Sequence, residues 1–270
     1  MKKGRSLGTY AVLYLVFLYA PIVLLPLFAF NDATIIAFPL KGFTTQWFEA
    51  LATNAALLQS LRNSLFIAVM TAIFATLLGM CAARAGAMAE FPGKKGIIGF
   101  VMLPLVLPEI IVAVSLLIVL RQVLGLNLNN WSVIAAHTLI CTPFSIAILN
   151  GAFQNLDPSM EEAAMDLGES RWSAFRLVTL PLVMPGIISS MLIAFTISLD
   201  EFIIAFFLTG ANPTMPVYIW GLLRFPAQLP VVMALGTILV TLSVVLLVIA
   251  EYFRRRGMAR AGVKDTGGFL

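Results

Sequence analysis

Long apolar runs alternate with short polar segments along nearly the whole chain. Six of these runs are long enough, as helices, to cross the roughly 30 Å of hydrocarbon in a bilayer. They cover residues 10–30, 60–83, 97–120, 132–152, 184–208 and 230–250. The pattern predicts an all-α, polytopic membrane protein with six transmembrane helices. Basic residues precede the first run as in a signal peptide, but its length and the lack of a small-residue cleavage site favour an uncleaved anchor.

Composition supports this interpretation. Hydrophobic residues make up 60% of the 270 residues and charged residues only 11%, whereas a soluble domain is about 25% charged. A soluble core of this size cannot bury so much apolar surface. The chain has one histidine and two cysteines, and no metal-ligand spacing. We therefore expect neither a metal site nor a catalytic centre.

The positions of lysine and arginine predict the orientation in the membrane. With the N-terminus inside the cell, 13 of the 17 basic residues fall on the cytoplasmic side. The four on the outer side are Lys41, Arg62, Arg121 and Arg224. Both termini are therefore predicted to be cytoplasmic. The net charge of +4 then reflects topology, and binding of nucleic acid is not expected.

Small residues recur along one side of the second run. They are Ala68, Ala72, Ala75, Gly79 and Ala82. Such a face lets another helix approach closely in lipid, although an alanine-rich helix without a special partner has the same spacing. In the fourth run, His137 is expected to be a packing or interface residue.

Two proline-containing stretches resemble each other. LPLVLPEII at 103–111 and LPLVMPGII at 180–188 share seven of nine positions. Chance in a chain rich in Leu, Pro and Val explains this at least as well as common ancestry of two halves. In the first stretch, Pro104 and Pro108 can break the helix and open backbone carbonyls to a cavity.

The longest predicted cytoplasmic loop lies between the fourth and fifth runs and contains signals for two short helices. Asp157 can cap the first helix, and Gly168 can end it in the left-handed conformation. Ser170 can cap the second helix, which we expect to end before Pro181.

The first of these two helices has an apolar face with small residues at its centre. The face consists of Met160, Ala163, Ala164 and Leu167. It lies beside the acidic N-terminal end formed by Glu161 and Glu162. The pattern indicates a docking surface for a partner protein, and an amphipathic connector resting on the membrane is the alternative.

The same loop resembles the EAA loop of ABC-importer permeases, whose pattern is E-A-A-x3-G-x9-I-x-L-P. Here Glu162-Ala163-Ala164 is followed at the same spacings by Gly168 and by Val178-Thr179-Leu180-Pro181, with valine in place of isoleucine. The resemblance implies that the loop at 157–181 supplies a coupling helix for a cytoplasmic ATPase subunit. The residues to which it assigns this role are Glu162, Ala163, Ala164, Gly168 and Pro181.

The resemblance also implies how the chain is organised. A MetI-like permease core is expected over residues 56–250. An N-terminal span with an outer interfacial segment, residues 1–55, precedes it, and a basic cytoplasmic tail, residues 251–270, follows. ATP is expected on a partner, because PGKKG at 92–96 lacks the upstream glycine and the following Ser/Thr of a phosphate-binding loop.

Among such permeases, the chain looks most like the second membrane subunit of spermidine/putrescine importers. The stretches that carry this resemblance are GFTTQWFEAL (42–51), LPEIIVAVSLL (107–117), AHTLICTPF (136–144), EEAAMDLG (161–168) and FTISLDEFIIAFF (195–207). That family usually has aspartates where this chain has Glu109 and Glu201. The charge is kept, but the side chain is one methylene longer.

Carboxylates inside a membrane are retained when they face a pathway or pair with a cation. Glu109, Asp200 and Glu201 have no obvious basic partner at similar depth, so a cationic passenger is expected. Adjacent helical residues point about 100° apart. We therefore place Asp200 on the pathway with Thr196, put Glu201 on its flank, and take Trp220 as a candidate aromatic contact. The alternative for each acid is structural, as a helix cap or a contact to a neighbouring subunit.

These observations predict a non-enzymatic permease subunit of an ATP-driven importer in the bacterial inner membrane, with a polyamine such as putrescine or spermidine as the passenger. Expected partners are a second homologous permease, two cytoplasmic ATPase subunits that hold ATP and Mg²⁺, a periplasmic substrate-binding protein, and membrane lipid. One alternative is the same importer type for another cationic or zwitterionic solute, such as an opine, a betaine or an amino-acid derivative. Another is an ion-coupled secondary transporter, which would not need an EAA-type loop.

Overall fold

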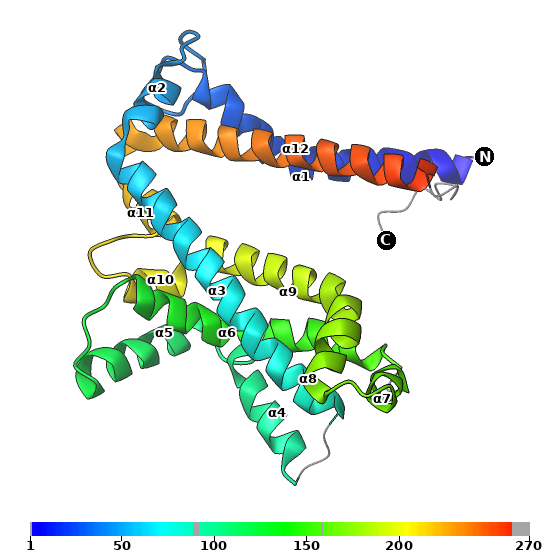
Figure 1. The fold of residues 1–270 in the computed structure, drawn as a ribbon. Coiled ribbons are helices and arrows are strands. Elements are labelled where there is room, and N and C mark those ends of the chain that lie inside the picture. The colour runs from blue at the N-terminus through cyan, green and yellow to red at the C-terminus, as the bar shows by residue number, and fades with distance from the viewer. Residues whose placement is uncertain (1, 89–91, 158, 261–270) are drawn as a thin grey trace. The chain divides into compact units, whose positions relative to one another are not determined.

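The protein is mostly helical in the part that the computed structural model describes, which is residues 2–88, 92–157 and 159–260 (Figure 1). These residues include no strand, and one isolated bridge pairs Asn31 with Phe43. The predicted all-α class is confirmed. The elements in chain order are α1 (Lys2–Ala29), α2 (Gln46–Thr53), α3 (Ala55–Met88), α4 (Lys94–Met102), the 3₁₀-helix η1 (Leu103–Leu105), α5 (Glu109–Ile118), the π-helix η2 (Val119–Val123), α6 (Asn130–Gln154), α7 (Ser159–Asp166), α8 (Arg171–Ala174), the π-helix η3 (Phe175–Thr179), α9 (Leu180–Asp200), α10 (Ile203–Leu208), α11 (Met215–Leu222), the 3₁₀-helix η4 (Pro226–Gln228) and α12 (Leu229–Arg260).

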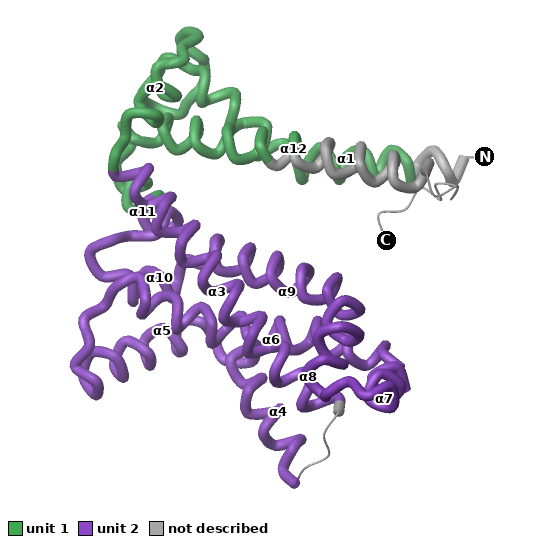
Figure 2. The backbone as a smooth tube through the Cα atoms, in the orientation of Figure 1, with its two compact units in different colours: residues 1–55, 219–270 green, residues 56–218 purple. Residues whose placement is uncertain are grey.

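The chain divides into two compact units, residues 1–55 with 219–270 and residues 56–218 (Figure 2). In the first unit, α1 and α12 pack against each other. Their contact is close at Gly236, where an added Cβ would lie 3.3 Å from the Leu25 side chain. The segment between α1 and α2 is held by Asn31, whose carbonyl accepts the Trp47 indole N–H at 2.8 Å and whose side-chain oxygen accepts the Lys41 backbone N–H at 2.9 Å.

The second unit is built around α6, the most buried of the long apolar helices. α9 packs along α6, and α5 packs against α10. One buried cluster joins side chains from five helices of this unit. Its members include Ile67 and Ala72 of α3, Val112 and Ala113 of α5, Val133 and Ile140 of α6, Ala194 of α9, and Ile204 and Leu208 of α10.

Four helical segments are each long and apolar enough to cross a membrane. They are Leu7–Ala29, Ala55–Ala87, Asn130–Gln154 and Arg171–Asp200. A fifth candidate consists of two pieces, Lys94–Leu105 and Glu109–Val123, bent by 100°. The sixth predicted run lies within α12. The count of six spans and the orientation of the termini stay predictions.

The third run is broken at its prolines, as predicted, whereas the opening of backbone carbonyls to a cavity stays a prediction. α4 passes into η1, which contains Pro104, and α5 begins only after Pro108, which occupies the position before its first turn. A proline ring clashes with the preceding helical turn and supplies no N–H, so two prolines four residues apart end the helix here.

Two predicted helix boundaries around α9 are wrong. The run at 184–208 is not one helix, because α9 ends at Asp200 and α10 is separate. The second loop helix does not end before Pro181, because α8, η3 and α9 form one span, Arg171–Asp200, that passes through it. Pro181 falls in the first turn of α9. The wider π-helical turn of η3 ahead of it leaves room for a residue that has no N–H.

The predicted small-residue face of α3 is a contact face. Ala68, Ala72 and Ala75 are buried, and Ala82 is half-buried. At Gly79 an added Cβ would lie only 2.5 Å from the Cβ of Ser145 in α6. This close approach explains why the face has no larger side chain.

We predict that Gly79→Ala lowers the free energy of unfolding by about 1–3 kcal/mol, because α3 and α6 must move apart. Gly99→Ala in α4 is the matched control, since nothing lies within 4 Å of the added Cβ there. That change should leave stability equal or raise it by up to about 1 kcal/mol, the gain in helix propensity. Thermal unfolding of the purified protein in detergent measures both. Equal melting temperatures for the two variants would contradict the close contact.

Candidate functional site

The loop between α6 and α9, which the sequence predicts to be cytoplasmic, contains the predicted helix caps. The backbone N–H of Ser159 donates to the Asp157 carboxylate at 3.0 Å. Hydrogen bonds from the side chain and backbone of Ser159 lower the pKa of Asp157, so the cap is charged at neutral pH. At the start of α8, the Ser170 hydroxyl accepts the N–H of Ser173 at 3.2 Å.

Helix α7 ends as predicted at Gly168, which has a positive φ of 96°. The N–H of Glu169 donates to the carbonyl of Ala164 at 3.2 Å, and the N–H of Gly168 donates to that of Met165 at 2.9 Å. This pair of bonds is the Schellman motif, which a left-handed residue makes possible. The motif turns the chain sharply between α7 and α8.

The predicted apolar face of α7 is divided between two sides of the helix. Ala164 is half-buried and lies on the inner side, whereas Ala163 and Leu167 are exposed. Glu162 is exposed as well. The outer side therefore presents a carboxylate, a small residue and a leucine that is 87% exposed. A single exposed apolar side chain is common on protein surfaces, so the docking role of this side stays a prediction.

Sequence reasoning missed two apolar residues beside this outer side. Trp172, in α8, is 71% exposed, and Leu177, in η3, is also exposed. The Trp172 ring packs against Phe175, with centroids 5.6 Å apart. The signal in the sequence was a tryptophan two residues after the Ser170 cap, inside a polar loop. Tryptophan is among the residues most enriched in protein interfaces.

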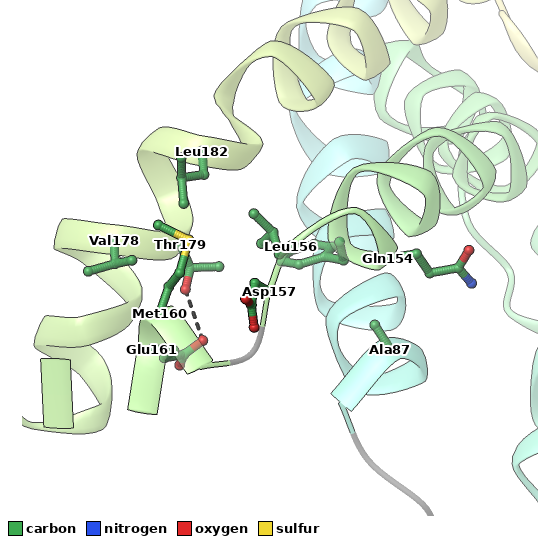
Figure 3. Close-up of a pocket in the computed structure, with 10 residues that line it drawn as sticks. Ala87, Gln154, Leu156, Asp157, Met160, Glu161, Val178, Thr179 and Leu182 are labelled. Carbon is green, nitrogen blue, oxygen red and sulfur yellow. Dashed lines mark hydrogen bonds between the residues drawn. The ribbon is translucent and has the colours of Figure 1, made fainter. Parts of the chain in front are cut away.

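The inner side of α7 is held by Glu161, to which the sequence assigned no site role. One carboxylate oxygen pairs with Arg84 of α3 at 2.7 Å. The other accepts the hydroxyl of Thr179, in η3, at 2.9 Å (Figure 3). The Arg84 guanidinium also lies 4.1 Å from the centroid of the Phe175 ring. We refer to Arg84, Glu161, Phe175 and Thr179 as the ionic node.

A cavity of about 220 Å³ lies beside the ionic node. Figure 3 shows Met160 and Glu161 of α7 on one side of it and Gln154 and Ala87 on the other. The C-terminal ends of α3 and α6 and the start of α9 also line the cavity. One side of α7 therefore faces this cavity.

The predicted pathway face of α9 is open within this chain. Ser189, Ile193, Thr196 and Asp200 are all exposed, as expected for residues on one face. The hydroxyls of Ser189 and Thr196 donate to carbonyls four residues earlier, at 2.9 and 2.8 Å. Asp200 is the last residue of α9, so its carboxylate stands at the end of the span rather than in its middle.

Glu201 lies in a different environment from its neighbour and is only 7% exposed. Its carboxylate accepts the N–H of Ile204 at 3.0 Å and that of Ala205 at 3.2 Å, which caps α10. The same carboxylate lies 3.4 Å from Nε2 of His137, a fully buried residue of α6. Nδ1 of His137 is hydrogen-bonded to the Ser198 hydroxyl at 2.8 Å. This arrangement is the structural alternative considered for Glu201, and a role for Glu201 in the pathway stays a prediction.

The remaining candidates lie on other helices. Glu109 is exposed at the first position of α5, directly after the 100° bend. Val112 and Ala113 of α5 share a buried cluster with Ile204 and Ala205 of α10, so the helix of Glu109 lies beside the break that follows Asp200. Trp220, in α11, is about half-exposed. Among the residues described, no three His, Cys, Asp or Glu side chains are grouped closely enough to hold a metal ion.

This combination of apolar helices and an EAA-type loop defines a membrane subunit of a transport system. Residues 75–257 match the family described as binding-protein-dependent transport system inner membrane component, and the chain belongs to this family of permeases. The resemblance stated from the sequence is thereby confirmed.

Relatives extend the similarity to nearly the whole chain. It is 35% identical over 267 residues to the spermidine/putrescine transport system permease protein PotC of Shigella flexneri, with 98% of each chain covered. It is 34% identical over 250 residues to the putrescine transport system permease protein PotI of Escherichia coli K12, with 89% of this chain and 87% of PotI covered. It is thus homologous to permease subunits of polyamine ABC importers.

A solved structure shows the same fold. A chain from a bacterial ABC transporter involved in the import of the acidic polysaccharide alginate superposes with a TM-score of 0.73 at 18% sequence identity. The match covers 94% of this chain and 98% of that one.

We predict that Glu201→Ala destabilises the protein by about 1–3 kcal/mol, because two buried N–H groups lose their acceptor. Asp200→Ala, one residue earlier, removes an exposed carboxylate and should change the free energy of unfolding by no more than about 0.5 kcal/mol. Unfolding of the two variants in detergent compares these values directly. An equal loss in both, or a larger loss in Asp200→Ala, would be inconsistent with the cap.

Proposed function

We propose that this chain is a permease subunit of an ATP-driven importer that moves a polyamine such as putrescine or spermidine across the bacterial inner membrane. The main support is the open face of α9, which ends in the exposed carboxylate of Asp200. Among the described residues no cation pairs with Asp200, and an intramembrane carboxylate of this kind is a candidate for contact with a passing cation.

The polyamine assignment has two further supports. PotC and PotI are named for spermidine/putrescine and putrescine transport, and the chain matches both over most of its length. Aromatic rings also lie close after the break. Phe206, in α10, is exposed, and its ring centroid is 5.6 Å from that of Phe202. Amine cations are attracted to the faces of such rings.

The two glutamates that replace the usual aspartates differ in what they imply for the substrate. Glu201 caps α10. Its methylene group, which an aspartate would lack, therefore affects the helix cap rather than contact with the substrate. Glu109 is exposed at the start of α5, so its longer reach bears on the passenger directly. We infer that any difference in substrate from the polyamine relatives arises at Glu109.

The remaining parts of the proposal concern assembly and topology. We propose six spans with both termini in the cytoplasm, in line with the distribution of basic residues. A second homologous permease, two ATPase subunits and a periplasmic substrate-binding protein would complete the importer. ATP hydrolysis would take place on the ATPase subunits. Their closure would push α7 and turn the cavity between the permeases outward.

The substrate assignment is tested by Asp200→Asn and Glu109→Gln, which keep size and hydrogen bonding but remove charge. Each should reduce uptake of labelled putrescine or spermidine, by about 10- to 150-fold, because a charge-assisted contact of roughly 1.5–3 kcal/mol is lost. Glu201→Gln should do less. Uptake is measured in vesicles that contain all subunits at matched expression, with a betaine as the comparison solute. Wild-type polyamine uptake in both variants would refute the cation pathway.

The docking role of α7 is tested separately with Ala163→Trp. A bulky side chain on the exposed outer side should block a fitted contact with the ATPase while the permease still inserts. Substrate-stimulated ATP hydrolysis should fall by at least about tenfold, the effect expected when a central interface position is overfilled. Gly99→Trp, at a position with open space in α4, is the control for size. Normal stimulation in Ala163→Trp would show that this surface is not the contact.

A further inference from the structure

The contacts at the two ends of α3 distinguish this helix from the others. α3 is one continuous helix of 34 residues without proline, which corresponds to about 50 Å at 1.5 Å per residue. Figure 1 shows it running without a break across the second unit. A long straight helix that is fixed at both ends moves as a rigid body.

The inner end of α3 is fixed to α7 by the ionic node. Arg84 donates to Glu161 at 2.7 Å, and its guanidinium lies over the Phe175 ring. Glu161 and Thr179 are both held away from solvent, since their side chains are respectively 13% exposed and buried. An ion pair in such partial burial is screened less by solvent than a surface pair. Movement of α7 therefore acts directly on the charge carried by α3.

Toward its outer end, in its third turn, α3 is fixed to the loop between α10 and α11, residues 209–214. The Ser64 hydroxyl accepts the N–H of Met215 at 2.7 Å, and the Asn63 amide donates to the carbonyl of Pro213 at 3.2 Å. Asn63 and Ser64 are both buried. The loop also packs tightly elsewhere, because a Cβ added at Gly210 would lie 2.5 Å from the carbonyl oxygen of Leu128.

The route along the chain from α7 to the same loop is less direct. It passes through η3, a π-helical turn, and then through α9 to the break between Asp200 and Ile203. A π-helical turn and a helix break both interrupt the regular hydrogen bonding of a helix. α3 has neither, so it is the stiffer connection between the two ends.

We propose that α3 is a strut, meaning a rigid helix that transmits movement from the coupling helix α7 to the outer loop 209–214. Arg84 is the positioning residue that passes the movement of α7 to α3. This inference rests on the proposed function, because it assumes that an ATPase moves α7. It adds that the nucleotide state of the ATPase changes the outer loop through α3.

The test uses the assembled importer and a charge swap at the ionic node. Arg84→Gln, Arg84→Glu and Glu161→Arg should each lower the ratio of substrate uptake to ATP hydrolysis by about two- to thirtyfold, the usual range for residues that carry coupling. Arg84→Glu combined with Glu161→Arg should recover most of this ratio, since the pair is restored with opposite polarity. Lys95→Glu, an exposed position in α4, makes the same charge change as Arg84→Glu and should keep the wild-type ratio.

A second readout follows the outer loop itself. Ala211→Cys, at an exposed position of the loop, is introduced with Cys81→Ser, because Cys81 is exposed and Cys141 is buried. Its rate of labelling by a water-soluble maleimide should change when ATP and vanadate hold the ATPase closed. The change should vanish in Arg84→Gln and Arg84→Glu and return in the charge swap, although co-purification shows that all subunits remain assembled.

The possible results separate this inference from the proposed function. Arg84→Glu could show the full labelling change and a wild-type ratio of uptake to ATP hydrolysis. That result would overturn the proposed role of α3 as a strut but would not contradict the proposed importer function. A loop whose labelling never responds to nucleotide would overturn it as well. A permease that binds no ATPase subunit would overturn the proposed function and this inference together.

Discussion

Every helix break inside a membrane protein must satisfy its backbone hydrogen bonds without help from water, and the second unit depends on this constraint. The break after Asp200 exposes the first N–H groups of α10, and the Glu201 carboxylate accepts two of them. The hydrogen-bonding arrangement at the break before α5 is different. Pro108 has no N–H to satisfy, and the carbonyl of Leu103 accepts the N–H groups of both Val106 and Leu107. Of these two breaks, the one after Asp200 is tied to another helix, because the Glu201 carboxylate also lies 3.4 Å from Nε2 of His137 in α6.

Close contacts between small residues bring the helices of this unit together. α3 approaches α6 at Gly79, and α9 approaches α6 at Gly186, where an added Cβ would lie 2.7 Å from that of Ala152. Thr76 and Ser190 then pair across α3 and α9 at 3.2 Å. Lipid offers no hydrophobic gain for helix association, so packing and buried polar pairs of this kind supply the cohesion. Contacts of this kind are the reason we propose that α3 moves as one body with its neighbours.

The sequence predicted local features well and distant contacts poorly. The caps at Asp157, Gly168 and Ser170 involve residues within a few positions of one another, so their chemistry is visible in the sequence. The partner of Glu161 is 77 residues away in α3, and no local pattern indicates it. The two LPLV stretches show a second limit of prediction from local sequence. The helix is bent by 100° at the first stretch, whereas it continues through α9 at the second. One of the two positions at which the stretches differ holds Glu109 in the first stretch and Gly186 in the second. Only the glycine lets a helix that contains a proline press against α6, whereas the charged side chain favours the end of a helix.

The adjacent carboxylates Asp200 and Glu201 follow from the same break. In a continuous helix the two would point about 100° apart and both would have to be accommodated in a membrane. Here the chain leaves helical geometry between them, since Glu201 is extended with ψ of 121°. One carboxylate turns inward to the first N–H groups of α10, and the other stays on the open face of α9. Because Glu201 satisfies the break, Asp200 does not have to serve as a cap, which is consistent with the role proposed for its charge.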